Sequence, residues 1–592
     1  MPGLKAVLSR TGLLAVALGL AACAGQGTAP DAGVSAGPVP APWRSAFDGG
    51  AALDDAGFGP FAAALIAESE SRHDRSARYY LEALKASPEN PVLAERAFAQ
   101  LLYSGRVGEA ARLTETLLAV PETEPVGPSY RSLAGLLHVL KAFRDEDWAT
   151  ARTRMDAHLN KGFAKLIAPA LRAWTHAGEG DTDAAIKALD PLLNHPRLHP
   201  IGLAHKAYLL DHAGRDQAAT DLYKALTSAD RPASFQPFIA YAHMMARQGD
   251  LNQAVNFLYD SARRFGNSRF LMREAVRIKT MGRPTQVVAR PQGAAGFIFY
   301  RLASEFSSGG SNRAAILYLR LSAYMAPEVE DTTLLLGSKM ADAGDHLGAA
   351  EALTAIPKGS PLWRSALGKR IDALWDGGDE ESALSLARNS LRVRPKDRPM
   401  LRRMGDMLRA RNRFEEADVY YSRIIDGLGD PGRNDWGVFF VRGIAREQAG
   451  DWPGAERDLL TALELKPDDP NVLNYLGYSW IDRDMHETRA KDMIRRAAKA
   501  RPEDGFILDS LGWVHFLTGD YEKAVVTLER AVKLEPGDPV LNEHLGDAYW
   551  KVGRRIEARF QWRHALTGGP DADREKALKD KLAFGLNPAA QD

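Results

Sequence analysis

Three carboxylates near the C-terminus have a spacing that could give them a shared task. Glu543 and Asp547 stand four residues apart, about one helical turn, and Asp509 stands 34 residues before Glu543. On one helical face such residues would hold a Lys or Arg side chain of a partner, or a backbone amide. Alternatively, they are exposed helix residues that improve solubility and do nothing more. The spacing leaves both interpretations open.

The sequence lacks the common arrangements that carry catalysis. It contains no His-Glu-x-x-His zinc helix, no Gly-x-x-x-x-Gly-Lys-Ser/Thr phosphate loop and no Gly-x-Ser-x-Gly nucleophile turn. Residues 427–432 fit Gly-x-Gly-x-x-Gly, but they follow a predicted helix and not a strand, so we interpret them as a loop. The 14 histidines are scattered. We therefore predict no catalytic residue, no metal site, no cofactor and no small-molecule substrate.

A repeat of about 34 residues must position these side chains. Within it a glycine, an alanine and a proline each recur at intervals of 34 or 35 residues, namely Gly443, Gly477, Gly512 and Gly546; Ala455, Ala490, Ala524 and Ala558; and Pro467, Pro502, Pro536 and Pro570. Apolar residues recur at three and four spacing on both sides of the turn 518–520, which predicts two helices per unit. The Gly477 unit carries one extra residue.

Geometry explains these residue types. The glycine and the alanine let two antiparallel helices approach closely, Leu528 and Trp562 fill the space beside them, and the proline ends the second helix. This pattern resembles the tetratricopeptide repeat (TPR), most clearly over residues 434–570 and more loosely upstream. The resemblance implies an all-α helix-turn-helix solenoid, a right-handed superhelix, in two repeat blocks.

Composition shifts along the chain suggest its divisions. We predict a signal peptide at 1–22, a Gly/Ala/Pro-rich tether at 23–58, an N-terminal TPR-like block at 59–280, a linker at 281–295, a C-terminal TPR block at 296–570, and a capping helix and tail at 571–592. Gly and Pro interrupt the helical pattern within 281–295.

The one cysteine of the chain, Cys23, closes a short apolar run. Lys5 and Arg10 precede the uncharged segment 11–22, which predicts a secretory signal too short to span a bilayer. Leu20-Ala21-Ala22-Cys23 resembles the lipobox of bacterial lipoproteins, which implies that Cys23 becomes the acylated first residue. The alternative is an ordinary secretory signal cut after an Ala-x-Ala stretch. Because Ala24 and not Asp follows, the lipoprotein resemblance implies the inner leaflet of the outer membrane, facing the periplasm.

Aromatic and acidic residues share the first-helix positions of the clearest repeats. In the TPR family these positions line a groove, so the resemblance implies a partner-binding groove with the members Asn474, Tyr478, Asp509, Trp513, Phe516, Glu543, Asp547 and Trp550. Alternatively, the aromatic residues pack between repeats. The family's clamp for a peptide carboxylate uses Lys and Asn, which argues against recognition of a free C-terminus here.

These features favour binding over catalysis. The 76 basic and 76 acidic residues give no electrostatic case for nucleic acid. The whole plan resembles the TPR lipoproteins of Gram-negative envelopes, and within them the adaptors that present cell-wall hydrolases to carboxyl-terminal processing proteases. We therefore expect a lipid-anchored scaffold with protein partners and no enzyme activity. The alternative is an assembly or stability factor for an outer-membrane or polysaccharide-export machine.

Overall fold

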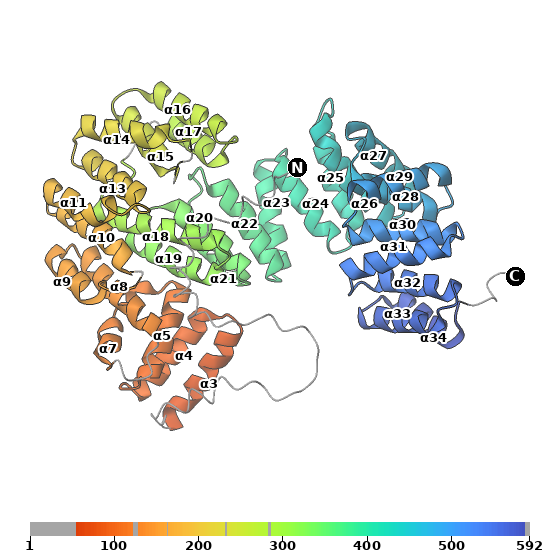
Figure 1. Ribbon diagram of the computed structural model, residues 1–592, viewed down its shortest axis with the longest axis horizontal. Helices are drawn as coiled ribbons and strands as arrows, with labels where there is room; N and C mark the ends of the chain where they lie inside the picture. Colours follow the sequence, from red (N-terminus) through yellow and green to blue (C-terminus); the bar gives the residue numbers. More distant parts are fainter. Residues whose placement is uncertain are drawn as a thin grey trace. The chain divides into compact units, whose positions relative to one another are not determined.

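The computed structural model describes residues 55–121, 128–162, 164–230, 232, 234–281 and 286–586. Throughout these residues the regular structure is helical and no strand occurs (Figure 1). The predicted all-α helical repeat fold is therefore confirmed. The chain divides into two compact units, one ending at Ala383 and the other beginning at Leu384. The predicted signal peptide, Cys23 and most of the predicted tether lie outside the described residues.

The first unit is a succession of antiparallel helices. Its elements are α3 (Asp55–Ser69), α4 (His73–Ala86), α5 (Pro91–Ser104), α6 (Val107–Ala110), α7 (Thr114–Ala119), α8 (Pro128–Arg144), α9 (Trp148–His158), α10 (Ala164–Gly178), α11 (Thr182–Ala188), α12 (Asp190–Leu193), α13 (His199–His212), α14 (Asp216–Ser228), α15 (Gln236–Arg247), α16 (Leu251–Arg264), α17 (Arg269–Met281), α18 (Pro291–Ser308), α19 (Asn312–Met325), α20 (Glu330–Asp342), α21 (His346–Ala352), η1 (Leu353–Ala355) and α22 (Trp363–Asp376). The unit boundary falls within α23 (Glu380–Val393).

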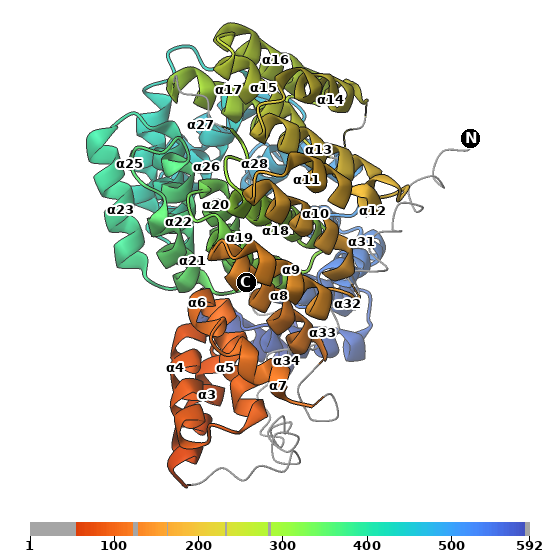
Figure 2. The same cartoon turned by 90° about the vertical axis from the view of Figure 1, so that its left-hand side faces the viewer.

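Within this unit the chain folds back on itself. Helix α18 packs against α10, and α19 packs against α5 and α6 (Figures 1 and 2). Arg320 of α19 donates a hydrogen bond to the Tyr103 carbonyl at 3.2 Å, and Gln292 of α18 donates to Glu146 at 3.0 Å. Helices α18 and α19 thus lie against α10, α5 and α6, which come much earlier in the chain.

The predicted break between repeat blocks at 281–295 lies inside the first unit, which ends at Ala383. Two further predicted boundaries also differ from the structure. Residues 55–58 of the predicted tether belong to α3, because the helix begins one to two turns before its first buried large side chain, Phe61. Residues 291–295 of the predicted linker belong to α18. Pro291 starts that helix, where its missing N–H costs nothing, and Gly296 continues it where a Cβ would lie 2.7 Å from the Cβ of Ala326. These Pro and Gly residues therefore begin and pack a helix.

The second unit contains the clearest repeats. Its elements are α24 (Arg398–Arg409), α25 (Phe414–Ile425), η2 (Arg433–Asp435), α26 (Trp436–Gln448), α27 (Trp452–Leu465), α28 (Pro470–Asp482), α29 (Glu487–Ala500), α30 (Gly505–Leu517), α31 (Tyr521–Leu534), α32 (Pro539–Lys551), α33 (Arg555–Thr567) and α34 (Ala572–Phe584). Each predicted repeat from α26 to α33 consists of a first and a second helix. The string 427–432 lies in the connection between α25 and α26, so its interpretation as a loop is confirmed.

The repeat glycines do what their spacing predicts. A Cβ at Gly512 would lie 2.6 Å from Cγ of Leu528, and one at Gly546 would lie 2.5 Å from the ring of Trp562. Each glycine therefore lets a bulky residue of the second helix pack against the first helix. The extra residue of the Gly477 unit lies in the turn between α28 and α29, where Asp484 and His486 adopt positive φ values of 53° and 45°.

Replacing Gly512 with Ala is expected to destabilise the C-terminal repeats by about 1–3 kcal/mol, because Leu528 must shift to make room. Gly537→Ala is the matched control, since nothing lies within 4 Å of its Cβ position and its φ is not positive. Urea titration of both variants measures the difference. Equal midpoints would contradict the packing role of Gly512.

Among the described residues, no helix combines the length and apolar composition that crossing a bilayer requires.

Candidate functional site

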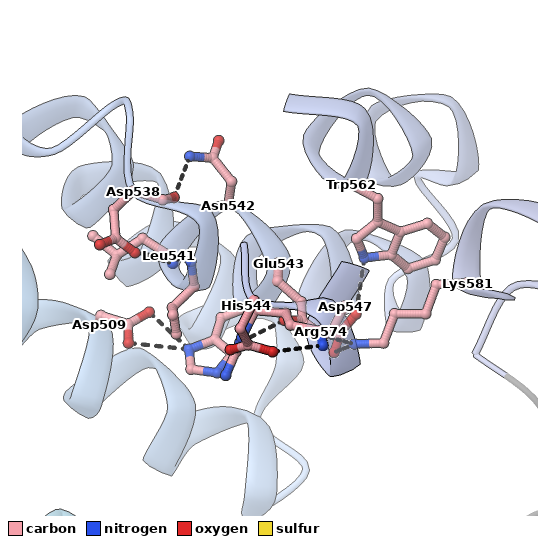
Figure 3. Close-up of polar contacts among 12 residues, drawn as sticks. Asp509, Asp538, Leu541, Asn542, Glu543, His544, Asp547, Trp562, Arg574 and Lys581 are labelled. Carbon is pink, nitrogen blue, oxygen red and sulfur yellow. Dashed lines mark hydrogen bonds and ion pairs between the residues drawn. The ribbon is translucent and has the colours of Figure 1, made fainter. Parts of the chain in front are cut away.

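Helix α32 carries the acidic pair that the sequence singled out. Asp538 caps its start by accepting hydrogen bonds from the backbone N–H groups of Val540 and Leu541 at 2.8 and 3.0 Å. Asn542 donates to the Asp538 carbonyl at 2.7 Å (Figure 3). The cap fixes where the first turn of α32 begins. Glu543 and Asp547, which stand four residues apart, therefore lie on one face of the helix.

A buried His and Asp pair joins α32 to the preceding first helix. Nδ1 of His544 lies 2.9 and 3.0 Å from the two carboxylate oxygens of Asp509 (Figure 3). The ring of Trp513 stacks on His544 at 4.1 Å between centroids and on Phe516 at 4.7 Å. The structure thus brings Asp509, Trp513 and Phe516 of α30 together around His544 of α32.

The acidic pair is neutralised by the last helix. Nζ of Lys581 lies 2.6 Å from Oε1 of Glu543 and 2.6 Å from Oδ2 of Asp547, and Arg574 reaches the other Glu543 oxygen at 2.6 Å (Figure 3). Nε1 of Trp562 donates to the remaining Asp547 oxygen at 2.9 Å. Together, Asp509, His544, Glu543, Asp547, Arg574 and Lys581 form what we call the first-helix network.

The carboxylates of this network are buried. Asp509, Glu543 and Asp547 are 5%, 8% and 4% exposed. Carboxylates are almost never buried at this level unless they are paired. The interpretation of these residues as exposed, solubilising side chains is therefore wrong. Through their hydrogen bonds and ion pairs, these carboxylates join α30, α32 and α34.

The network shifts the pKa values of its members in the directions that charge and burial dictate. Burial raises the pKa of Asp547 despite Lys581. Burial also acts on Glu543, but Lys581 and Arg574 outweigh it and lower the pKa of that carboxyl. Burial opposes the charged form of His544, yet Asp509, Asp547 and Glu543 raise its pKa above the ordinary value. The three acids thus favour the protonated form of His544.

Because the folded pKa of His544 is raised, its contribution to stability is complete below the ordinary His value of about 6.5 and is lost as pH rises through the folded value. The urea midpoint of the C-terminal repeats is expected to fall from about pH 6 to about pH 9. Asp509→Asn should flatten this slope, whereas His564→Asn, on an exposed site, should leave it unchanged. An unaltered slope in Asp509→Asn would contradict the assignment.

The other predicted groove residues lie at the two ends of the network. Tyr478 of α28 is half-buried, and burial followed by the charges of Asp509 and Asp482 raises its pKa to about 12. One turn before it, Oδ1 of Asn474 is buried without a hydrogen-bond partner in the described part of the chain. Trp550 packs against Trp562 at 5.3 Å, and a Cβ at Gly585 would collide with its ring.

Sequence reasoning missed the cations. His544, Arg574 and Lys581 were not singled out, although one signal was available: Lys581 stands 34 residues after Asp547, so the repeat period continues into α34. Helix α34, which was predicted to cap the array, thus occupies the position of a further first helix in the repeat.

A separate pocket lies in the first unit. Its volume is about 570 Å³, and α15, α17, α18, α20 and the loop 357–362 line it. The charged groups at its wall pair with one another, Arg273 with Asp331 and Arg290 with Glu328. In the part of the chain that the structure describes, no group of three His, Cys, Asp or Glu side chains could hold a metal ion.

The described residues form an all-α, TPR-like array of helical repeats. The family model described as "TPR repeat" matches residues 512–553, which span α30 to α32. These residues include three of the six members of the first-helix network, Glu543, His544 and Asp547.

The chain is similar to several known proteins. The chain is 34% identical over 113 residues to the TPR repeat-containing protein PA4667 of Pseudomonas aeruginosa, and the match spans 19% of each chain. A tetratricopeptide repeat protein from Parabacteroides merdae superposes with a TM-score of 0.33 at 14% identity, over 50% of this chain and 99% of that one. A chain of the APC/C heterotetramer Cut9-Hcn1 superposes with a TM-score of 0.36 at 13% identity, over 90% of this chain and 97% of that one.

Proposed function

We propose that this protein is a lipid-anchored scaffold that binds protein partners on the periplasmic side of the outer membrane. The observation that carries the proposal is the first-helix face of α28, α30 and α32, where the aromatic residues Tyr478, Trp513 and Phe516 flank buried, ion-paired acids. Tyr and Trp are the residues that most often carry binding energy in protein interfaces. A scaffold of this kind acts by bringing partners together and needs no catalytic group of its own.

The anchor part of the proposal rests on the sequence around Cys23. Replacing Cys23 with Ser is expected to release the folded repeat protein from membranes into the soluble periplasmic fraction, because the acyl acceptor is lost. Fractionation of cells followed by immunoblotting measures the release. A Cys23→Ser protein that stays with the membrane would contradict the lipid assignment, and Ala24→Ser serves as the matched control that should remain bound.

For the partner, we propose a carboxyl-terminal processing protease and its cell-wall hydrolase substrates. What supports this is the plan of lipobox, tether and repeat array, which resembles such adaptors. Crosslinking in intact envelopes, followed by identification of the captured proteins, tests it. Capture of a protease together with a wall hydrolase is expected. Capture of integral outer-membrane or export proteins instead would favour the assembly-factor alternative and overturn the adaptor proposal.

The same capture experiment tests the binding face. Trp513→Ala is expected to lower partner recovery at least tenfold, because it removes the ring stacked on Phe516 and His544. Val526→Ala is the matched control, since Val526 is exposed on the second helix α31. Unchanged recovery with Trp513→Ala, at intact helical content, would refute this face as the binding surface.

A further inference from the structure

Helix α34 meets the first-helix face through three side chains on one side. Arg574, Leu578 and Lys581 stand at positions i, i+4 and i+7, which share a helical face. The two cations pair with Glu543 and Asp547, and Leu578 is fully buried in the core formed by α31, α32 and α33. The pattern is basic, apolar, basic along little more than two turns.

Apart from its ion pairs, α34 has only a small apolar contact with this face, made by Leu578 and the partly buried Leu582. In this fully described helix of 13 residues, Leu578 is the one buried side chain, and Phe584 is 71% exposed. A helix of this length is marginal on its own, and nothing follows α34 in the described residues to pack on its outer side. Terminal elements with few buried contacts open at low cost.

The acceptor side of the contact does not depend on α34. Helix α32 packs against α33 and α31, and the bulky anchors Leu545, Tyr549 and Trp562 lie in the core that these helices share. When α34 leaves, Glu543 and Asp547 therefore keep their places on α32 and lose their cations. The two acids and the apolar patch beside them can then bind another helix that has the basic, apolar, basic pattern of α34.

We infer that the first-helix face of α32 is a binding site for a cationic amphipathic helix with the pattern basic-x3-apolar-x2-basic, and that α34 occupies it as an exchangeable internal ligand. The inference rests on the proposed scaffold function and gives its partner a chemistry. A partner helix carrying Arg or Lys seven residues apart, with Leu between them, replaces α34 by making the same ion pairs. A partner that lacks the cation at the Lys581 position leaves the buried Asp547 without an ion pair and is rejected. One that lacks the cation at the Arg574 position loses the second ion pair of Glu543 and binds less tightly.

The test uses the full chain and a fluorescent peptide of residues 571–586, followed by fluorescence anisotropy. The variant Arg574→Glu/Lys581→Glu repels its own α34 from Glu543 and Asp547, so it is expected to bind the peptide at least tenfold more tightly than the wild-type chain. The matched control Lys576→Glu/Lys579→Glu makes the same change in net charge at exposed positions of α34 and should bind like wild type. A peptide with Glu at 574 and 581 should bind to none of them.

A second variant guards against misfolding of the first. Leu578→Ala keeps every charge and removes the buried contact of α34, so it is also expected to bind the peptide at least tenfold more tightly than wild type. Circular dichroism verifies helical content. Equal peptide affinity in wild type and in every folded variant would overturn the inference. Because the peptide comes from the chain itself, this result is independent of partner capture from envelopes, which tests the proposed function.

Discussion

Replacing Trp562 with Ala is expected to destabilise the C-terminal repeats by about 3–5 kcal/mol. The indole is fully buried in the core that joins α31, α32, α33 and α34. It also packs over Gly546, where no Cβ stands in its way, and its Nε1 donates to Asp547 at 2.9 Å. The substitution therefore opens a cavity and removes a donor from a buried carboxylate at once.

Urea unfolding monitored by circular dichroism, with hydrogen exchange to locate the loss in α32 to α34, measures this effect. Phe560→Ala on the same helix is the matched control, because Phe560 is 61% exposed and its loss should stay within about 0.5 kcal/mol. Trp562→Phe separates the two causes, since it keeps most of the volume and removes the hydrogen bond. Equal stability of Trp562→Ala and Phe560→Ala would show that the indole is not the anchor of this core.

The repeat could be predicted because the close approach of the two helices restricts which residue types fit at each position. Only glycine at 512 and 546 leaves room for Leu528 and Trp562, and both the period and the filling residues were visible without coordinates. Helix ends were harder to place. Pro291 resembles a helix breaker in the sequence and starts α18 in the structure, because proline is unfavourable inside a helix but favourable at its first position.

The site could be predicted only by half. The acids Asp509, Glu543 and Asp547 and the aromatic Trp513 follow from their repeat positions, and they do lie together. Their burial and the cations that pair with them could not be predicted. An acidic residue on a helix face can be exposed to solvent or paired with a cation, and only the position of the next helix decides between the two. His544 illustrates the limit. A histidine beside a repeat glycine gives no sign that an acid one repeat earlier will face it.

Replacing Lys581 with Met is expected to cost about 3 kcal/mol, because it removes the cation that Glu543 and Asp547 share while keeping the length of the side chain. Glu543 retains Arg574, so the larger penalty falls on Asp547, which keeps the indole donor of Trp562 but loses its ion pair with Lys581. The urea midpoint of the C-terminal repeats at pH 7 measures the loss. Lys579→Met is the matched control, since Lys579 pairs with Glu575 of its own helix in solvent.

The pH dependence of this loss identifies its cause. The pKa of Asp547 is already raised in the wild-type fold, chiefly by burial, and removing Lys581 raises it further. A carboxyl whose pKa is higher in the folded state is stabilised there by protonation, so the deficit of Lys581→Met should be full near pH 7 and shrink as pH falls toward the ordinary Asp range of about 4. If the cation merely contributed packing through its stem, the deficit would be the same at both pH values. A shrinking deficit with Lys581→Met and a flat one with Lys579→Met would therefore place the energy in the buried charge, which is the same charge that a partner helix must meet.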